Sequence, residues 1–171
     1  MTSGGGRVLR VEADGGSRGN PGPAGYGAVV KDSATGEVLA EVAESIGRAT
    51  NNVAEYRGLL AGLRAAHGID PGARVEVRMD SKLVVEQMSG RWQIKHADMR
   101  ALADQARALI RPGAVDFGWI PRAQNSDADR LANEAMDAAA AGRPWQRTLG
   151  AGTTKLLASA TPAPKAAVVD P

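Results

Sequence analysis

Apolar residues recur at strand-like spacing near the start of the chain and at helical spacing further on. Apolar segments at 7–14, 24–31 and 37–46 are joined by short links, which predicts three consecutive strands in an antiparallel meander. The pattern then changes period after Asn52. The new stripe has the 3, 4, 7 spacing of an amphipathic helix and consists of Tyr56, Leu59, Leu60 and Leu63.

Strands and helices alternate through the rest of the chain. Residues 73–80 predict a strand that runs directly into a short helix at 81–90. A second helical stripe follows at 99–110, then a strand at 114–120 and a helix from residue 126 to about residue 141. The order β-β-β-α-β-α-α-β-α predicts an α/β fold in which helices pack on the faces of a mixed sheet.

The character of the sequence changes after Trp145. Residues 146–171 are rich in Ala, Thr, Gly and Pro without sustained periodicity, which is typical of a linker. We therefore expect a flexible N-terminus at 1–6, one folded domain at 7–145, and a disordered tail or linker at 146–171. Because the tail stops without a cap, we expect the chain to be the N-terminal part of a longer polypeptide.

Composition excludes several classes of site. The 171 residues include no cysteine, so a disulfide framework, a thiolate zinc site and a cysteine nucleophile are ruled out. No apolar run approaches the roughly 20 residues that cross a bilayer, and no signal peptide is evident. We expect a soluble cytoplasmic monomer. The net charge of +2 is too small to indicate a nucleic-acid partner by itself, so a polyanion site must be local.

Four acidic residues stand at the ends of predicted strands or near the starts of predicted helices: Asp14, Glu55, Asp80 and Asp129. Each has an ordinary structural interpretation. Asp14 precedes glycines and can simply make a hairpin turn, while Asp80 or its neighbour Ser81 can simply cap the next helix. Glu55 and Asp129 each lie three residues after an Asn or Ser, which is the spacing of a capping box.

Taken together, the four acids indicate a metal centre. If segments 7–14 and 73–80 are neighbouring strands, Asp14 and Asp80 leave them at the edge where open α/β sheets place their sites. A set of carboxylates with no cysteine and only two histidines suits Mg²⁺ or Mn²⁺, and such a cluster needs a cation to offset its repulsion. This chemistry indicates phosphoryl transfer with two metal ions. The glycines after Asp14 would then let backbone approach a bulky substrate.

Four motifs in order resemble ribonuclease H of the bacterial type 1 family. They are D-G-x-x-x-G-N-P-G-P-A-G-Y-G at 14–27, R-x-T-N-N-x-A-E at 48–55, M-D-S followed by LVVEQ at 79–87, and N-S-D-A-D-R-L-A-N-E-A at 125–135. The similarity runs from about residue 7 to residue 141. It implies the five-stranded ribonuclease H-like fold with strand order 3-2-1-4-5, flanked by helices. It also implies endonucleolytic hydrolysis of the RNA strand of RNA/DNA hybrids by a two-metal-ion mechanism.

The resemblance also implies roles for individual residues. The catalytic Mg²⁺, with Mn²⁺ as a substitute, is expected on Asp14, Glu55, Asp80 and Asp129. Contacts with the minor groove of the hybrid, where 2′-hydroxyls distinguish RNA from DNA, are expected from Asn20, Asn51 and Asn52. A phosphate of the DNA strand is expected to bind Arg48 and Thr50.

The chain departs from the family pattern in two places. The loop before the last helix has Arg122 and no histidine, so a histidine proton shuttle is not expected. We interpret Arg122 either as a phosphate contact that helps product release or as a solvated loop residue, and both histidines as ordinary polar residues. The basic protrusion of many relatives is missing. Trp92 and Lys95 are a remnant of it, unless Trp92 belongs to the core.

Two alternative functions remain open at this point. One is a catalytically inactive hybrid-binding module, which four intact acids argue against. The other is a different ribonuclease H-fold nuclease, such as an exonuclease or integrase-like enzyme, which the TNN segment and the absence of D-x-E at Asp14 argue against. Similar domains in some high-GC bacteria are fused to a histidine-phosphatase-like domain, so we expect a C-terminal phosphatase-like domain to follow the tail.

Overall fold

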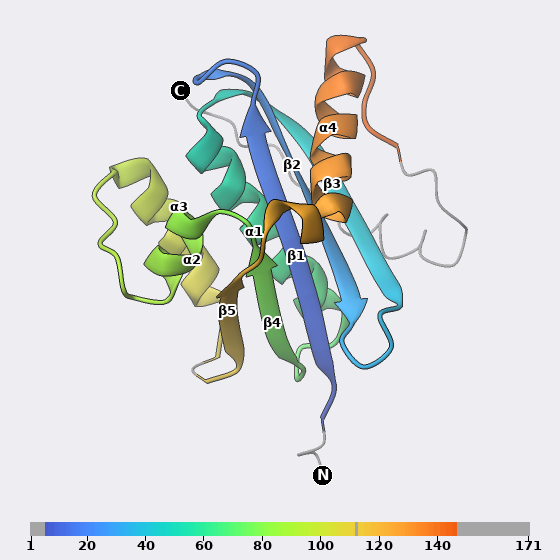
Figure 1. Ribbon diagram of the computed structural model, residues 1–171, viewed down its shortest axis with the longest axis vertical. Helices are drawn as coiled ribbons and strands as arrows, with labels where there is room; N and C mark the ends of the chain where they lie inside the picture. The colour runs from blue at the N-terminus through green and yellow to red at the C-terminus, as the bar shows by residue number, and fades with distance from the viewer. Residues whose placement is uncertain (1–5, 112, 147–171) are drawn as a thin grey trace.

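Five strands form one mixed sheet in the computed structural model, which describes residues 6–111 and 113–146 (Figure 1). The strands are β1 (Val8–Ser17), β2 (Gly22–Asp32), β3 (Val38–Ala49), β4 (Arg74–Met79) and β5 (Val115–Trp119). Their order is β3-β2-β1-β4-β5. β2 runs antiparallel to both β1 and β3, whereas β4 runs parallel to both β1 and β5. The predicted topology is confirmed.

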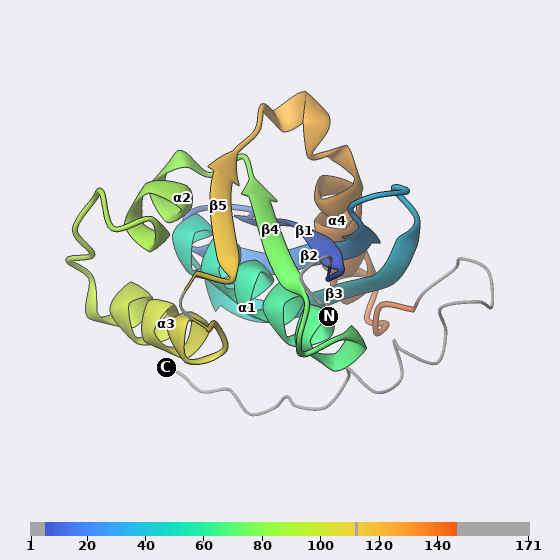
Figure 2. The same ribbon diagram turned by 90° about the horizontal axis from the view of Figure 1, so that it is seen from below.

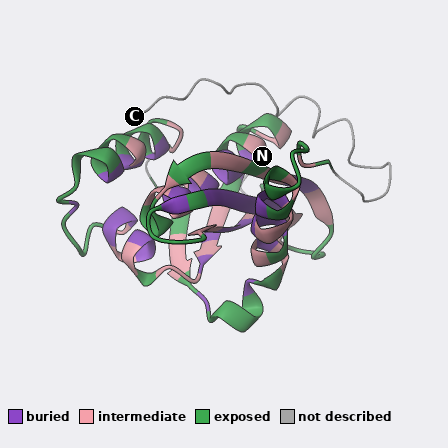
Figure 3. Cartoon of the chain, turned by 90° about the horizontal axis from the view of Figure 1, so that it is seen from above, coloured by how far each residue is buried: buried purple, intermediate pink, exposed green. Residues whose placement is uncertain are grey.

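Helices cover both faces of this sheet. They are α1 (Asn51–Ile69), α2 (Lys82–Met88), α3 (Ala97–Ala108) and α4 (Ser126–Ala140), with the 3-10 turn η1 (Arg122–Gln124) before the last. Figures 1 and 2 show α1 on one face with α3 beside it, and α4 on the other. The buried residues lie along the strands and on the helix sides that face them (Figure 3). No helix in the described part of the chain is long and apolar enough to cross a membrane.

The glycine-rich segment after Asp14 is mostly strand. β1 continues through Ser17 and β2 already begins at Gly22, so only residues 18–21 connect them. Asp14 lies within the ladder and pairs with Gly27 of β2. The prediction that Asp14 ends its strand or belongs to a turn was therefore wrong, because the glycine backbone is satisfied by strand pairing rather than by a loop.

The cap of α2 is one of the two predicted residues, whereas the cap of α1 differs from the predicted one. Thr50 caps α1, where its Oγ1 accepts a hydrogen bond from the backbone N–H of Val53 at 3.3 Å. Ser81 caps α2 in the same way. The capping-box interpretations of Glu55 and Asp129 were wrong, since neither carboxylate bonds the start of its own helix in the described structure. Both carboxylates are thereby left for other contacts.

Glycines bring the helices close to the sheet. A Cβ atom added at Gly27 would lie 2.5 Å from Cβ of Leu131 in α4, and one added at Gly15 would lie 2.3 Å from the backbone of Ala54 in α1. Only glycine fits such approaches. These contacts place the first turn of α4 and the start of α1 next to the end of β1.

Two of the domain predictions concern parts of the chain that are largely not described. The expected flexible N-terminus at 1–6 and the expected tail at 146–171 lie almost entirely outside the described residues. The folded region extends to Trp145, whose indole N–H donates to Glu134 of α4 at 3.0 Å.

Candidate active site

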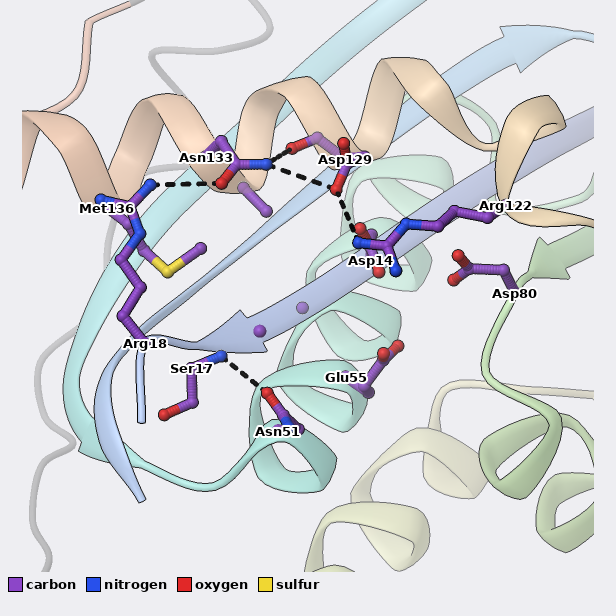
Figure 4. Close-up of a pocket in the computed structure, with 13 residues that line it drawn as sticks. Asp14, Ser17, Arg18, Asn51, Glu55, Asp80, Arg122, Asp129, Asn133 and Met136 are labelled. Carbon is purple, nitrogen blue, oxygen red and sulfur yellow. Dashed lines mark hydrogen bonds and ion pairs between the residues drawn. The ribbon is translucent and has the colours of Figure 1, made fainter. Parts of the chain in front are cut away.

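Four elements bring the four predicted acids to one place. Asp14 comes from β1, and Asp80 follows directly on β4, the parallel neighbour of β1. Glu55 reaches the same point from the first turns of α1, so that Asp14, Glu55 and Asp80 each have a ligand atom within 4.8 Å of the others. Asp129, in the first turn of α4, lines the same pocket (Figure 4).

Burial and mutual repulsion make these carboxylates hard to ionise without a cation. Asp14 is only 7% exposed. Desolvation, followed by the charge of Asp80 and contact with Asp129, raises the pKa of Asp14 to about 8. Desolvation and the charges of Asp14 and Asp80 raise the pKa of Glu55 to about 9. A cation bound at the cluster would therefore favour the ionised form of these carboxylates.

The donor set fits a hard divalent cation. All the converging groups are carboxylates, the ligands that Mg²⁺ and Mn²⁺ prefer. Oε1 of Glu55 is buried without a hydrogen-bond partner in the described structure, although a buried polar atom normally has one. A cation bound between Asp14, Glu55 and Asp80 would satisfy this oxygen and offset the repulsion. These three residues could hold a metal ion.

A buried amide, which the sequence interpretation did not single out, supports the acids. Asn125 is fully buried, and its Nδ2 donates to the carbonyl of Ala13 at 2.9 Å and to Oδ1 of Asp80 at 3.4 Å. The indole N–H of Trp119 donates to the backbone carbonyl of Asp80 at 3.2 Å. Asn125 opens the last of the four family motifs, so its place in the motif was the available signal.

Two of the predicted minor-groove residues, Asn20 and Asn51, accept hydrogen bonds from backbone N–H groups at the edge of the pocket. Oδ1 of Asn51 accepts from the N–H of Ser17 at 2.8 Å, and Oδ1 of Asn20 accepts from the N–H of Asn51 at 3.0 Å. These bonds tie the β1–β2 turn to the start of α1. Because both side-chain oxygens are occupied, the amide NH₂ groups remain as donors for a ligand.

The other predicted substrate residues lie nearby on exposed backbone. Asn51 lines the pocket, whereas the lining does not include Asn52, which is exposed in the first turn of α1. Arg48 and Thr50 are exposed at the end of β3 and at the cap of α1. Arg48, Thr50 and Asn52 are thus close to Asn51 in sequence, but none of the three lines the acidic pocket.

Two arginines line the pocket along with the acids. Arg122 comes from η1; its side chain is 79% exposed, and Nη2 lies 3.8 Å from Oδ1 of Asp129. Arg18, from the β1–β2 turn, was missed by the sequence interpretation because nothing in its local pattern indicates that it reaches α4. Both histidines are exposed and neither lines the pocket. Trp92 is 46% exposed, so its interpretation as a core residue was wrong.

Known proteins similar to this chain include ribonucleases H. The family model described as "Reverse transcriptase-like" matches residues 12–135. "Bifunctional protein Rv2228c" of Mycobacterium tuberculosis is 63% identical over 132 residues, which cover 76% of this chain and 36% of that protein. "Ribonuclease HI" of Halobacterium salinarum is 48% identical over 137 residues, covering 78% of this chain and 66% of that one. The chain therefore spans only about a third of the first of these relatives.

A solved structure matches both the fold and the extent of the domain. The crystal structure of LC11-RNase H1 in complex with an RNA/DNA hybrid is 39% identical to this chain, with a TM-score of 0.73. The match covers 77% of this chain and 99% of that one.

Proposed function

Because this chain belongs to the bacterial type 1 ribonuclease H family, we propose that it cleaves the RNA strand of RNA/DNA hybrids endonucleolytically. The observation that carries this proposal is the convergence of Asp14, Glu55 and Asp80 within 4.8 Å, with Asp129 in the same pocket. Two Mg²⁺ ions held by these four residues, with Mn²⁺ as a possible substitute, would activate water for attack on the phosphodiester and stabilise the leaving 3′ oxygen.

The protein residues hold this arrangement in place. Asp14 and Asp80 stand on adjacent parallel strands, so their separation is set by the sheet. Asn125 bridges the two strand ends through the carbonyl of Ala13 and the carboxylate of Asp80. Preorganised ligands of this kind need no rearrangement at the moment of reaction. Neither His67 nor His96 lines the described pocket, so we assign no histidine as the acceptor of the proton from the attacking water.

Substrate choice is proposed to depend on the asparagines beside the pocket. Asn20 and Asn51 keep their NH₂ groups as donors, and Asn52 is exposed one residue further along α1. Such donors suit acceptors in the minor groove, including the 2′-hydroxyl that marks RNA. Arg48 and Thr50 would bind a phosphate of the DNA strand. The RNA/DNA hybrid in the LC11-RNase H1 crystal structure supports a hybrid as the ligand of this surface.

A cleavage assay with a panel of substrates tests the proposed activity. An end-labelled RNA/DNA hybrid, a DNA duplex and an RNA duplex of one sequence would each be incubated with Mg²⁺, Mn²⁺ or chelator. We expect internal cleavage of the RNA strand of the hybrid, dependent on metal, and no cleavage of the DNA duplex. Binding of the hybrid without cleavage in either metal would contradict the proposed nuclease activity and support an inactive hybrid-binding module.

The properties of the whole protein are proposals as well. We propose a cytoplasmic monomer whose native chain continues into a C-terminal phosphatase-like domain. The greater length of Rv2228c, which carries "Bifunctional" in its name, supports a longer polypeptide. Mass spectrometry of the native product tests this, and a chain ending at Pro171 would contradict it.

A further inference from the structure

Arg18 crosses the edge of the candidate active site to reach the opposite element. It belongs to the turn between β1 and β2, yet its Nη2 donates to Oδ1 of Asn133 in α4 at 3.2 Å (Figure 4). The same nitrogen forms an ion pair with Oδ1 of Asp137 at 2.8 Å. Residues of α4 thus hold the guanidinium at the pocket and set its distance from the acid cluster.

Most of the hydrogen-bonding capacity of this guanidinium is left over. Within the described structure, neither Nε nor Nη1 of Arg18 makes a hydrogen bond or ion pair. Its charged partner Asp137 is 69% exposed, and ion pairs at such exposure contribute little. The remaining Nε–H and Nη1–H donors of the charged guanidinium can each bond an oxygen of a phosphodiester. A phosphate can therefore bind Arg18 without displacing a buried contact.

Asn133 connects Arg18 to the acidic cluster. Its Nδ2 donates to the backbone carbonyl of Asp129 at 3.0 Å and to Oδ1 of Asp129 at 3.3 Å, while its Oδ1 accepts from Arg18. Asp129 and Asn133 lie four residues apart in α4, which is about 6 Å along the helix axis. That length is comparable to the separation of neighbouring phosphates along one strand. One amide thus sets the spacing between a cluster acid and a phosphate-binding group.

We propose that Arg18 binds the phosphodiester next to the scissile one in the RNA strand, and that Asn133 is the positioning residue that holds Arg18 and Asp129 at the matching separation. This inference rests on the proposed function, because it takes the scissile phosphate to lie at the acid cluster. Arg18 then fixes the register of the RNA strand, so that one particular bond lies over the four carboxylates.

Hybrid binding by matched variants tests this assignment. The dissociation constant would be measured in Ca²⁺ for the wild-type chain and for Arg18→Ala, using a hybrid with an unmodified RNA strand. A second hybrid would carry one uncharged methylphosphonate linkage next to the scissile position. We expect Arg18→Ala to weaken binding of the unmodified hybrid about tenfold, the usual effect of losing a charged hydrogen bond. The salt slope should fall by about 1.

The methylphosphonate linkage should weaken hybrid binding by the wild type as much as Arg18→Ala weakens binding of the unmodified hybrid. It should weaken binding by Arg18→Ala little further. We expect the methylphosphonate to cost the wild type about tenfold and Arg18→Ala no more than about twofold, because the partner is already gone. Arg74→Ala is the matched charge control, since Arg74 is exposed at the start of β4, the opposite end of the strand from the pocket. Asp137→Asn removes the ion pair of Arg18 but keeps the guanidinium, and it should bind the hybrid like the wild type.

Each contrary result has a defined meaning. Equal hybrid affinities of Arg18→Ala and Arg74→Ala would overturn the assignment. It would also be overturned if Asp137→Asn lost as much hybrid affinity as Arg18→Ala does. If the wild type cleaves the hybrid in Mg²⁺ while Arg18→Ala binds normally, the inference fails and the proposed function stands. If the wild type neither binds nor cleaves the hybrid, both fail.

Discussion

The carboxylates of the candidate site lie closer together than their charges favour in the absence of a cation. Desolvation and neighbouring acids raise the pKa of Asp14 to about 8 and that of Glu55 to about 9, from ordinary values of 3.8 and 4.5. Between about pH 4 and about pH 8 the unfolded chain therefore binds fewer protons than the metal-free folded protein. Stability must fall as the pH rises through that window.

This linkage predicts an unusual pH dependence for the metal-free protein. In chelator, its melting temperature should fall between about pH 5 and about pH 8, and Mg²⁺ should raise it more at the higher pH, because binding favours the ionised carboxylates. Calorimetry in chelator and in Mg²⁺ measures both effects. Asp80→Asn removes a charge that raises both pKa values, so its metal-free melting temperature should depend less on pH. A wild-type dependence no steeper than that of Asp80→Asn would contradict this account.

Arg122 stands in the loop where many relatives have a histidine, and a substitution tests its role. Its guanidinium stays protonated near neutrality and lies 3.8 Å from Asp129, so it can contact a phosphate but cannot act as a base. We expect Arg122→Ala to lower turnover about tenfold without shifting the pH profile, because no titrating group is lost. Steady-state rates across pH measure this. Unchanged turnover would make Arg122 a solvated loop residue, and a shift of about one pH unit would indicate a hidden proton shuttle.

At the scale of elements, close helix–sheet packing determines whether the acids meet. α4 lies against β2 where β2 has Gly25 and Gly27, and this approach brings Asp129 to the cluster. The sequence interpretation placed Gly25 and Gly27 in the predicted strand at 24–31 but gave them no packing role. Their packing role depends on which helix face meets which strand, and local sequence does not record that.

Gly27→Ala should therefore destabilise the fold. The added Cβ would lie 2.5 Å from Cβ of Leu131 and 2.6 Å from the carbonyl oxygen of Ala128, so α4 must shift. We expect a loss of about 1–3 kcal/mol in the free energy of unfolding, as for other overpacked positions. Denaturant titration measures it. Gly68→Ala is the control: Gly68 lies in α1 with nothing within 4 Å of an added Cβ, so alanine should be neutral or stabilising. Equal effects of the two substitutions would contradict the packing argument.

At the scale of the whole molecule, the order of elements and the meeting of the acids could be predicted, whereas the supporting contacts could not. Periodicity distinguishes strands from helices. In the parallel register of β1 and β4, Ala13 pairs with Met79, so Asp14 and Asp80 are the next residues on neighbouring chains and their proximity follows from the topology. The contacts of Asn125 and Arg18 depend instead on where one buried residue after an exposed turn and one face of α4 lie after packing. No short-range pattern encodes such placements.

The overall charge predicts a moderate dependence of hybrid affinity on salt. The net charge is only +2, and Trp92 and Lys95 are the only trace of a basic protrusion. We expect a slope of log affinity against log salt concentration of about −3 to −4, at about 0.9 for each neutralised phosphate. Titrations in Ca²⁺ at several salt concentrations measure it. A slope of about −8 would indicate an additional basic surface.

We propose that the four-acid pocket is a metal centre that cleaves RNA in hybrids. The most direct test is cleavage of a labelled hybrid in Mg²⁺ by the wild type and by Asp14→Asn, with hybrid binding of both measured in Ca²⁺. Asp14→Asn removes a ligand charge but no proposed phosphate contact, so it should bind the hybrid nearly as well as the wild type while cleavage falls by a factor of about 100 or more. A variant that keeps more than about a tenth of wild-type cleavage would contradict the claim.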